Sequence, residues 1–482
     1  MHESGLASKT NSRRLLWVVA GVSALFALLS ARPYAGSWND GSRLASVEAI
    51  VDYDTLAIDD SVFLAPIFLP DNAPPPYAPD DALSLKYGTL DRLLIDGHWY
   101  SDKPYVPQVM LAGVYKFAQL TTGLQANRHA DVFNYLMTVV SSGVSLVAFA
   151  LAGFIAARRT LGCPIGAAVL TASFTLSTAA LAYSRHVNAN LPLAACAMVI
   201  LALLTCSVDE EGQLKLRTRR VAIIGLLAGL TYALESATGG LLCLALGLLL
   251  VWQCWLNDRS RWHLPLVLTL TALPLIALHH VFNFRIGGTF GPANANPAYL
   301  NWPGSPFAGG ELTGQWNHDN VFRAVLYSLE LLFGRKGFLW LNPPMLVGAV
   351  AAVCLLVAPR RRFAIAGATR GQRAILWCAF GWTAAVWLLY GALSTNRSGV
   401  CYSIRWFVPM LAPGLLAVAL LLRHRHELWP RFAVFAVAGG VLGAIGWWNG
   451  PWAEVRGYLM WPVVGVMMVV WAVMSLREMK RA

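Results

Sequence analysis

Long apolar runs recur along the whole chain and alternate with short polar segments. A helix needs about 20 predominantly apolar residues to cross a bilayer. On that measure the pattern predicts about twelve transmembrane helices, with ten to thirteen compatible with it, near residues 15–31, 130–157, 164–183, 188–206, 219–234, 237–256, 264–283, 338–357, 373–393, 404–422, 431–449 and 457–475. We therefore expect an all-α polytopic membrane protein in which residues 1–482 form a single integral membrane domain.

The composition agrees with this pattern, since 57% of the residues are hydrophobic, only 13% are charged and the mean hydropathy is +0.53. Soluble domains carry about 25% charged residues. The net charge of +12 could suit nucleic acid, but most Lys and Arg residues stand in short clusters between apolar runs. The sequence therefore predicts membrane lipid, and no nucleic acid, as a partner.

The basic residues also predict an orientation. Alternate polar segments hold more than half of the 37 Lys and Arg residues, among them Arg158–Arg159, Lys215 to Arg220 and Arg360 to Arg362. The positive-inside rule places such segments in the cytoplasm, together with both termini. The N-terminus resembles a signal peptide, with Lys9, Arg13 and Arg14 ahead of the first apolar run. The residues after that run make a poor cleavage site, so we expect an uncleaved helix.

Large loops are then expected on the outer face. The first covers about residues 32–129 and the second about residues 284–337. Within the first, apolar residues at helical spacing predict an amphipathic helix from about Ser42 that lies in the membrane interface. A second short juxtamembrane helix is expected from about Val106. The inner loops are short and hold no Gly-rich phosphate loop, so we expect any chemistry on the outer face.

Asp40 is the first candidate for chemistry, because it follows the outer end of the first predicted span closely. A carboxylate held at the membrane surface could act as general base on an acceptor hydroxyl. Asp is also favoured as a helix N-cap, and the two roles are compatible. A second group is Asp102-Lys103-Pro104 with His98 upstream, where Lys offers a point charge for phosphate. A plain juxtamembrane turn with solvated charges is the alternative for that group.

Arg185 and His186 lie between two predicted spans that have hardly any loop between them. Ionisable groups at that depth usually face a polar cavity or a partner. Together they would form a clamp for a lipid-linked phosphate, and the alternative is snorkelling to lipid headgroups. Glu235, alone at another outer turn, is compatible with catalysis and equally with a structural ion pair to a cation such as Arg185.

A last group on the outer face contains Arg397, Tyr402 and Arg405, the last of which is expected to open a helix at the outer surface. Each of these residues is a weak candidate alone. The predicted topology nevertheless places all of them on the face that carries Asp40. They are therefore candidate contacts for an anionic or polar substrate.

Four segments carry a resemblance to a known family: N-D-G-S-R-L-A-S-V-E-A-I-V-D, S-D-K-P-Y, Y-S-R-H-V-N-A-N and G-R-K-G-F-L-W-L-N-P-P. With the large first outer loop, they resemble the GT-C superfamily of membrane glycosyltransferases, in the branch of bacterial protein mannosyltransferase relatives and the lipid A aminoarabinose transferase. The chain departs from that pattern in two places. Asn39-Asp40 leaves one carboxylate where the family often has two, and Tyr105 replaces the second proline of a K-P-P-like motif.

The resemblance implies a GT-C-like fold and a hexosyl- or pentosyltransferase in the bacterial cytoplasmic (inner) membrane, with its active site facing the periplasm or outside. Such an enzyme moves a sugar from a polyprenyl-phosphate donor to a lipid, glycan or protein acceptor. Asp40 would be the catalytic base. The remaining predicted site residues are Lys103, Arg185, His186 and Arg405 for the donor phosphate, and Asp102, His98, Glu235, Arg397 and Tyr402 for substrate.

No cofactor is certain from the sequence. Asp40, Asp102 and Glu235 are candidate ligands for a divalent metal, but nothing in the sequence requires one. Two other functions stay open: a transporter or flippase of lipid-linked glycans, and an oligosaccharide polymerase or ligase. A transporter should carry polar residues deep in its spans, whereas here the ionisable residues gather at the outer ends of the spans, which favours an enzyme.

Overall fold

The computed structural model describes residues 2–78, 82–256, 259–307, 313–356, 368–453 and 457–479. Its helices are α1 (His2–Ser30), α2 (Trp38–Asp52), α3 (Ala82–Tyr87), α4 (Tyr105–Thr122), α5 (Ala130–Thr138), α6 (Val144–Leu161), α7 (Pro164–Leu176), α8 (Ala179–Tyr183), α9 (Asn190–Thr205), α10 (Thr218–Leu234), α11 (Ser236–Leu256), α12 (His263–Gly287), α13 (Pro297–Leu300), α14 (Val321–Phe333), α15 (Phe338–Leu341), α16 (Pro343–Leu356), α17 (Arg370–Ala392), α18 (Leu411–His424), α19 (Trp429–Asn449) and α20 (Gly457–Met479). A π-helical stretch, Val139–Gly143, joins α5 to α6, and a 3₁₀ helix, Arg405–Met410, leads into α18.

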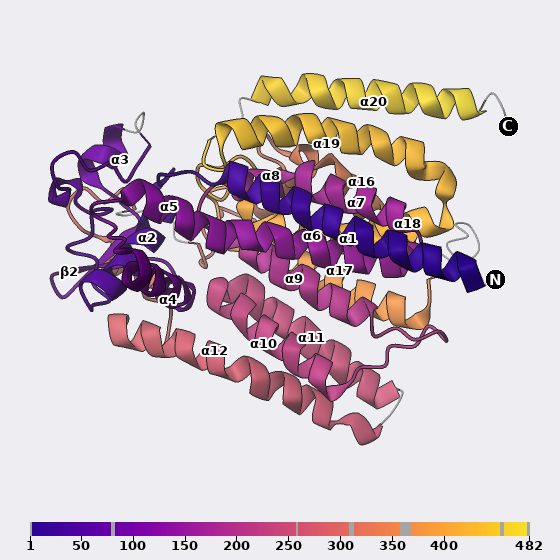
Figure 1. The fold of residues 1–482 in the computed structure, drawn as a ribbon, viewed down its shortest axis with the longest axis horizontal. Helices are drawn as coiled ribbons and strands as arrows, with labels where there is room; N and C mark the ends of the chain where they lie inside the picture. Colours follow the sequence, from indigo (N-terminus) through magenta and orange to yellow (C-terminus); the bar gives the residue numbers. More distant parts are fainter. Residues whose placement is uncertain are drawn as a thin grey trace.

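The helices form an elongated bundle, as Figure 1 shows. Within the described residues, seven helical segments are long and apolar enough to cross a membrane, or eight if the pair Val321–Leu341 and Pro343–Leu356, bent by 111°, is one span. This confirms a helical protein of the membrane class. The expected count of twelve is not reached by this test, because several expected spans, such as those at α7, α9 and α10, form helices of fewer than 18 residues.

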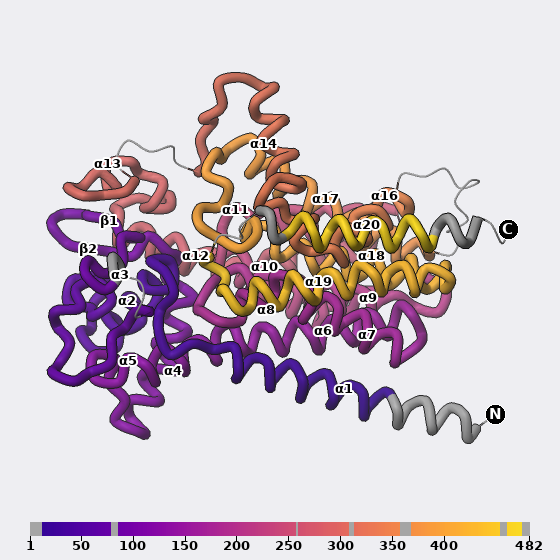
Figure 2. Tube along the Cα trace, turned by 90° about the horizontal axis from the view of Figure 1, so that it is seen from above, coloured from indigo at the N-terminus to yellow at the C-terminus, as the bar shows by residue number. Residues whose placement is uncertain are grey.

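The first loop lies at one end of the bundle. In Figures 1 and 2 the elements from α2 to α4 gather at this end, while α1 and α20 extend toward the other. The expected second loop is partly helical, because α12 continues to Gly287 and α14 forms before the bend. The expected basic cluster Arg360 to Arg362 lies outside the described residues.

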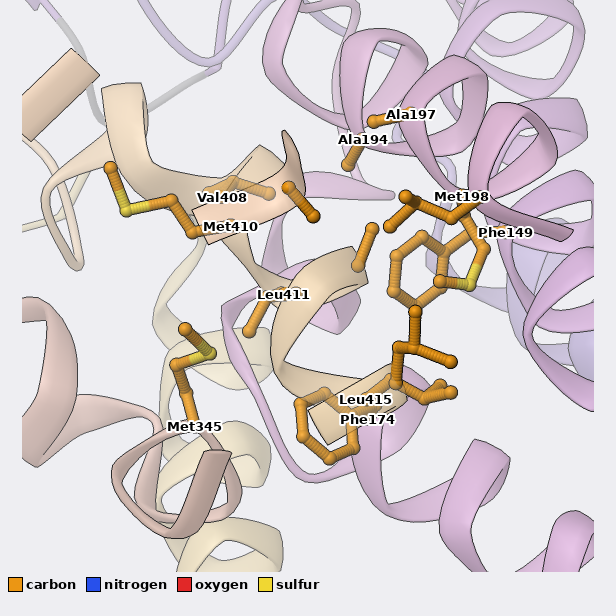
Figure 3. Close-up of a cluster of buried hydrophobic side chains, with 14 of the residues drawn as sticks. Phe149, Phe174, Ala194, Ala197, Met198, Met345, Val408, Met410, Leu411 and Leu415 are labelled. Carbon is orange, nitrogen blue, oxygen red and sulfur yellow. The ribbon is translucent and has the colours of Figure 1, made fainter. Parts of the chain in front are cut away.

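The centre of the bundle is α18, in which most residues are buried. Figure 3 shows Leu411 and Leu415 of this helix among Phe149, Phe174 and Met198. Small residues let its neighbour α16 approach closely: a Cβ added at Gly348 would lie 2.9 Å from the Cα atom of Gly414. Close backbone approach at small residues is typical of helix packing in membranes.

The first loop has an apolar core of its own, which includes Leu44, Val47, Phe63, Tyr115 and Phe133. The sequence predicted the helix near Ser42 as amphipathic and interfacial, but α2 is buried on every side from Asp40 to Ala49. It packs against α4, the second expected juxtamembrane helix. The polar residues of α2 therefore lie inside the protein rather than against lipid headgroups.

A β-hairpin in the first loop is a departure from the all-α expectation. Strands β1 (Arg92–Ile95) and β2 (His98–Ser101) pair antiparallel, with Arg92 opposite Ser101 and Ile95 opposite His98. The turn residues Asp96 and Gly97 have φ of 53° and 86°, as a type I′ turn requires. The hairpin matters for the site because Asp102 and Lys103 follow directly after β2.

Candidate active site

A polar cavity of about 480 Å³ lies where the first loop meets the end of the bundle. The walls come from α2, the end of the hairpin, the start of α9, the junction of α10 and α11, α12, and the segment that joins α17 to α18. Among the described residues, its charged lining side chains are Arg43, Asp102, Lys103, Glu235 and Arg405. Four of these five were predicted as site residues from the sequence, and Arg43 was not.

Arg43 is the buried cation of the cavity. It lies one helical turn after Asn39, so both side chains project from the same face of α2 into the cavity. Arg43 is 7% exposed, and its Nε atom has no hydrogen-bond partner within the described part of the chain. Burial lowers the pKa of Arg43 to about 10, although the negative charges of Asp102 and Glu235 act to raise it. The guanidinium therefore remains charged at neutral pH and is free to bind an anion.

Lys103 is bracketed by two carboxylates. Its Nζ atom lies 2.7 Å from Oδ2 of Asp102 and 2.8 Å from Oδ2 of Asp91. Burial raises the pKa of Asp102, while the charge of Lys103 lowers it. The Ser42 hydroxyl donates a longer hydrogen bond, 3.3 Å, to Asp102 Oδ1. Lys103 therefore orients Asp102 and has little net charge left for a ligand.

Glu235 stands at the break between α10 and α11, with backbone angles that end the first helix. The Tyr390 hydroxyl hydrogen-bonds the Glu235 side chain, and no ion pair to Glu235 is formed among the described residues. Burial raises the pKa of Glu235 above its ordinary value of 4.5, against the opposing charges of Arg43 and Arg405. Asp102 is paired with Lys103, so Glu235 is the cavity carboxyl without an ion pair in the described part of the chain and the candidate proton acceptor.

Arg405 begins the 3₁₀ helix that precedes α18, as the sequence predicted for the start of a helix. Its guanidinium carbon lies 5.9 Å from the centre of the Trp452 ring. Trp406, the next residue, stacks on Tyr390 with ring centres 4.3 Å apart and planes 5° apart. This rigid aromatic pair fixes the wall that carries both Arg405 and the hydrogen-bond partner of Glu235.

Asp40 points away from this cavity. Its carboxylate accepts hydrogen bonds from the backbone N–H of Gly36 (2.7 Å), from the backbone N–H of Ser37 (2.8 Å) and from the Ser37 hydroxyl (2.7 Å). Together with the Ser37 side chain it forms a capping box at the start of α2. His186, with Nδ1 3.3 Å from Asp40, is likewise buried outside the described lining. The Asp40 oxygens are thus bonded to the N-terminal turn of α2, outside the described lining of the cavity.

Arg185 caps a helix end. Its Nη1 atom donates to the carbonyl oxygens of Trp447 and Trp448, the latter at 2.5 Å, in the last turn of α19. A cation is stabilised there by the negative end of the helix dipole. Arg185 and Glu235, proposed from the sequence as a possible ion pair, do not form one in the described part of the structure. The neighbouring Asn190, rather than Arg185, lines the cavity.

Three further predicted residues also lie outside the described lining. His98 is exposed on the hairpin, with Nδ1 2.9 Å from Asp59. Arg397 forms an exposed ion pair with Glu330, with 2.7 Å between Nε and Oε1. Tyr402 is fully buried, and its hydroxyl donates to the carbonyl oxygen of Leu442.

Sequence reasoning missed Asn39 and Arg43 as well as two residues of α12, His279 and Asn283, that line the cavity. The i,i+4 spacing of Asn39 and Arg43 was the available signal. As to metals, the described residues contain no group of three or more His, Cys, Asp or Glu side chains that could hold an ion. Of the three candidate ligands, Asp102 and Glu235 line the cavity and Asp40 does not.

No family model and no curated protein sequence matches this chain. Several solved structures are similar to it, and three of them are described here. ArnT from Cupriavidus metallidurans, bound to undecaprenyl phosphate, is 15% identical, with a TM-score of 0.49 over 95% of this chain and 78% of that one. The Archaeoglobus fulgidus oligosaccharyltransferase in its apo form is 12% identical, with a TM-score of 0.47 over 92% of this chain and 57% of that one.

The third structure is oligosaccharyltransferase AglB from Archaeoglobus fulgidus, in complex with an inhibitory peptide and a dolichol-phosphate. It is 12% identical, with a TM-score of 0.45 over 92% of this chain and 56% of that one.

Proposed function

We propose that this protein is a membrane glycosyltransferase that moves a sugar from a polyprenyl-phosphate donor to a lipid, glycan or protein acceptor. One observation carries the proposal: a single cavity at the end of an apolar helix bundle contains two guanidinium groups, of Arg43 and Arg405, and a carboxyl group, of Glu235, with a raised pKa. Sugar transfer from a sugar phosphate needs both kinds of group: the cations stabilise the departing phosphate, and the base removes the proton of the acceptor hydroxyl.

Arg43 and Arg405 are the proposed phosphate-binding groups. Guanidinium groups bind phosphate through paired hydrogen bonds, and Arg43 has an unused Nε donor within the described structure. As the bond from the anomeric carbon to the phosphate oxygen breaks, negative charge grows on the leaving group. Fixed cations in a buried cavity stabilise that charge strongly.

Glu235 is the proposed general base, in place of Asp40. Its carboxylate takes the proton of the acceptor hydroxyl while the hydroxyl oxygen forms a bond to the anomeric carbon. The bond to phosphate breaks in the same step, and polyprenyl phosphate leaves with the electron pair. Asp102, held by Lys103, lines the same cavity and is the proposed group that positions the acceptor.

The lipid chain of the donor is assigned to an apolar groove between α11 and α17. This groove has a volume of about 430 Å³ and is lined by residues such as Leu241, Leu248, Trp377 and Ala385. It starts about one turn below the polar cavity, because Ala237 of α11 and Leu389 of α17 line the cavity itself. A polyprenyl chain in the groove would place its phosphate beside Glu235 and the two arginines.

The protein is proposed to reside in a bacterial cytoplasmic membrane, with the cavity on the outer side and both termini in the cytoplasm. Support comes from α1 and α20, which extend toward the end of the bundle opposite the cavity-bearing loop (Figure 2). The basic segments near the termini favour the inner side for that end. In this arrangement the donor reaches the cavity laterally from the bilayer.

The test is release of polyprenyl phosphate by the purified protein in detergent, supplied with polyprenyl-phosphate hexoses or pentoses and a membrane extract as acceptor source. We expect release by the wild type and none by the Glu235→Gln variant. A transporter would bind these donors and release nothing, so intact donor in every reaction would overturn the proposal.

A further inference from the structure

Helix α12 presents two polar side chains to the cavity, one turn apart. His279 and Asn283 both line it, together with Ile286 of the same helix. The Nε2 atom of His279 and the Nδ2 atom of Asn283 are buried, and neither has a hydrogen-bond partner within the described residues. Their i,i+4 spacing places them on one face of α12.

Unpartnered nitrogen atoms of this kind are unusual, because the large majority of buried side-chain polar atoms in folded proteins have at least one hydrogen-bond partner. His279 is 3% exposed, so the protein rather than bulk water surrounds it. Its ring is packed edge-on against Tyr232 (ring centres 5.6 Å apart, planes at 90°) and against His280 (5.4 Å, 78°). The imidazole is therefore held in place with one nitrogen unused.

His280, the next residue, shows that the unused nitrogen is specific to His279. Both ring nitrogens of His280 have partners: Nε2 lies 2.9 Å from the Tyr232 hydroxyl, and Nδ1 lies 2.7 Å from the carbonyl oxygen of Phe290. His280 is thus satisfied within the protein. It does not belong to the described lining of the cavity, although it neighbours His279 in the chain.

We propose that His279 and Asn283 form the subsite for the sugar of the donor, binding hydroxyl groups of an uncharged hexose or pentose. This inference rests on the proposed function. The charged lining residues come from other elements, whereas α12 contributes an imidazole, an amide and Ile286 in the described lining. A wall of neutral hydrogen-bonding groups suits neutral hydroxyls, and the arginines take the phosphate.

The test compares two probes, bare undecaprenyl phosphate and a panel of undecaprenyl-phosphate-linked neutral hexoses and pentoses, bound to the full-length protein in detergent. We expect the wild type to bind at least one glycosylated lipid more tightly than the bare lipid. The His279→Ala and Asn283→Ala variants should each weaken that binding by about tenfold and leave the affinity for bare lipid unchanged. His280→Ala is the matched control, which should keep the sugar preference even where it lowers thermal stability.

Each other outcome is decisive. A wild type that binds bare and glycosylated lipids equally, or His279 and Asn283 variants that lose affinity for both lipids alike, would overturn the sugar subsite alone. A wild type that binds neither lipid would overturn the proposed function as well. If an alanine variant does not fold, His279→Gln and Asn283→Ser replace it, since each keeps a polar group but moves it, and the same selective loss is expected.

Discussion

The Asp40 carboxylate lies 3.3 Å from Nδ1 of His186, and both side chains are buried outside the described lining of the polar cavity. The residue before Asp40 and the residue three positions after it, Asn39 and Arg43, face that cavity instead. Successive residues of an α-helix are rotated by about 100° about its axis, so the side chains of adjacent residues point into different surroundings. In this chain the acidic position faces the protein, and an amide and a guanidinium face the cavity.

Substitution of Asp40 should therefore affect folding rather than chemistry. Asp40→Asn removes the charged acceptor of the capping box and is expected to cost about 1 kcal/mol of stability. The folded fraction should keep its transfer rate. Thermal unfolding in detergent, measured with the transfer rate per folded molecule, checks this. Ser37→Ala removes the other side chain of the capping box and should have the same effect. If Asp40→Asn abolished transfer without changing the unfolding temperature, Asp40 would again be the candidate base.

Substitution of Arg43 should affect the donor phosphate. Arg43→Gln removes a buried cation with an unused donor, and we expect transfer to fall by about 10²- to 10³-fold. Arg397→Gln is the matched control, because Arg397 pairs with Glu330 in an exposed position outside the cavity. Exposed ion pairs contribute little, so the control should stay near the wild-type rate. Equal rates for the two variants would remove Arg43 from the site.

The first loop shows how far sequence patterns reach. Apolar spacing correctly predicted helices near Ser42 and after Pro104, found as α2 and α4. It could not predict that α2 is enclosed on all sides, since that depends on packing against α4 and the rest of the loop. The hairpin was missed although Asp96-Gly97 between two short runs rich in large apolar and aromatic residues is a strong turn signal.

The site shows the same limit. Membrane topology brought Asp102, Lys103, Glu235 and Arg405 to one face, and the structure brings them to one cavity. Topology alone could not separate these residues from Arg185, which binds carbonyl oxygens at the end of α19. Which residues line the cavity depends on the direction in which each side chain points from its turn. That direction is set by tertiary packing and cannot be predicted from residue spacing.

The pH dependence of transfer should reflect Glu235. Burial raises its pKa above the ordinary 4.5, and a general base acts only when it is deprotonated. The rate should therefore fall as the pH is lowered, with a midpoint above the titration of an ordinary glutamate. A pH–rate profile measures this fall in rate at low pH. The control Asp59→Asn changes an acidic residue outside the cavity and should leave the midpoint unchanged. A flat profile down to pH 4.5 would exclude Glu235 as the base.

The pH dependence of stability should reflect Glu48, a buried residue of α2. Its Oε2 atom accepts hydrogen bonds from the Ser61 hydroxyl (2.6 Å) and the Val62 N–H (3.1 Å), but burial prevails and raises the pKa of Glu48 to about 8. The folded protein then keeps a proton that the unfolded chain releases near pH 4.5. Where the folded state binds more protons, stability falls as pH rises.

This contribution to stability should thus be complete below about pH 4.5 and be lost progressively up to about pH 8. Glu48→Gln, which mimics the protonated carboxyl, should flatten that part of the curve. Melting temperatures in detergent across this range provide the measurement. A wild-type curve that rises steadily from pH 5 to pH 8, unchanged in the variant, would show that Glu48 is ionised in the folded protein.

The polar cavity and the groove between α11 and α17 are proposed to hold one polyprenyl phosphate between them. The most direct measurement is an experimental structure of the wild-type protein in lipid nanodiscs with undecaprenyl phosphate. We predict density for the phosphate within hydrogen-bond distance of Arg43 and Arg405, and for the chain along Leu241, Leu248 and Trp377. A phosphate bound elsewhere, with Arg43 and Arg405 unoccupied at saturating lipid, would contradict the account.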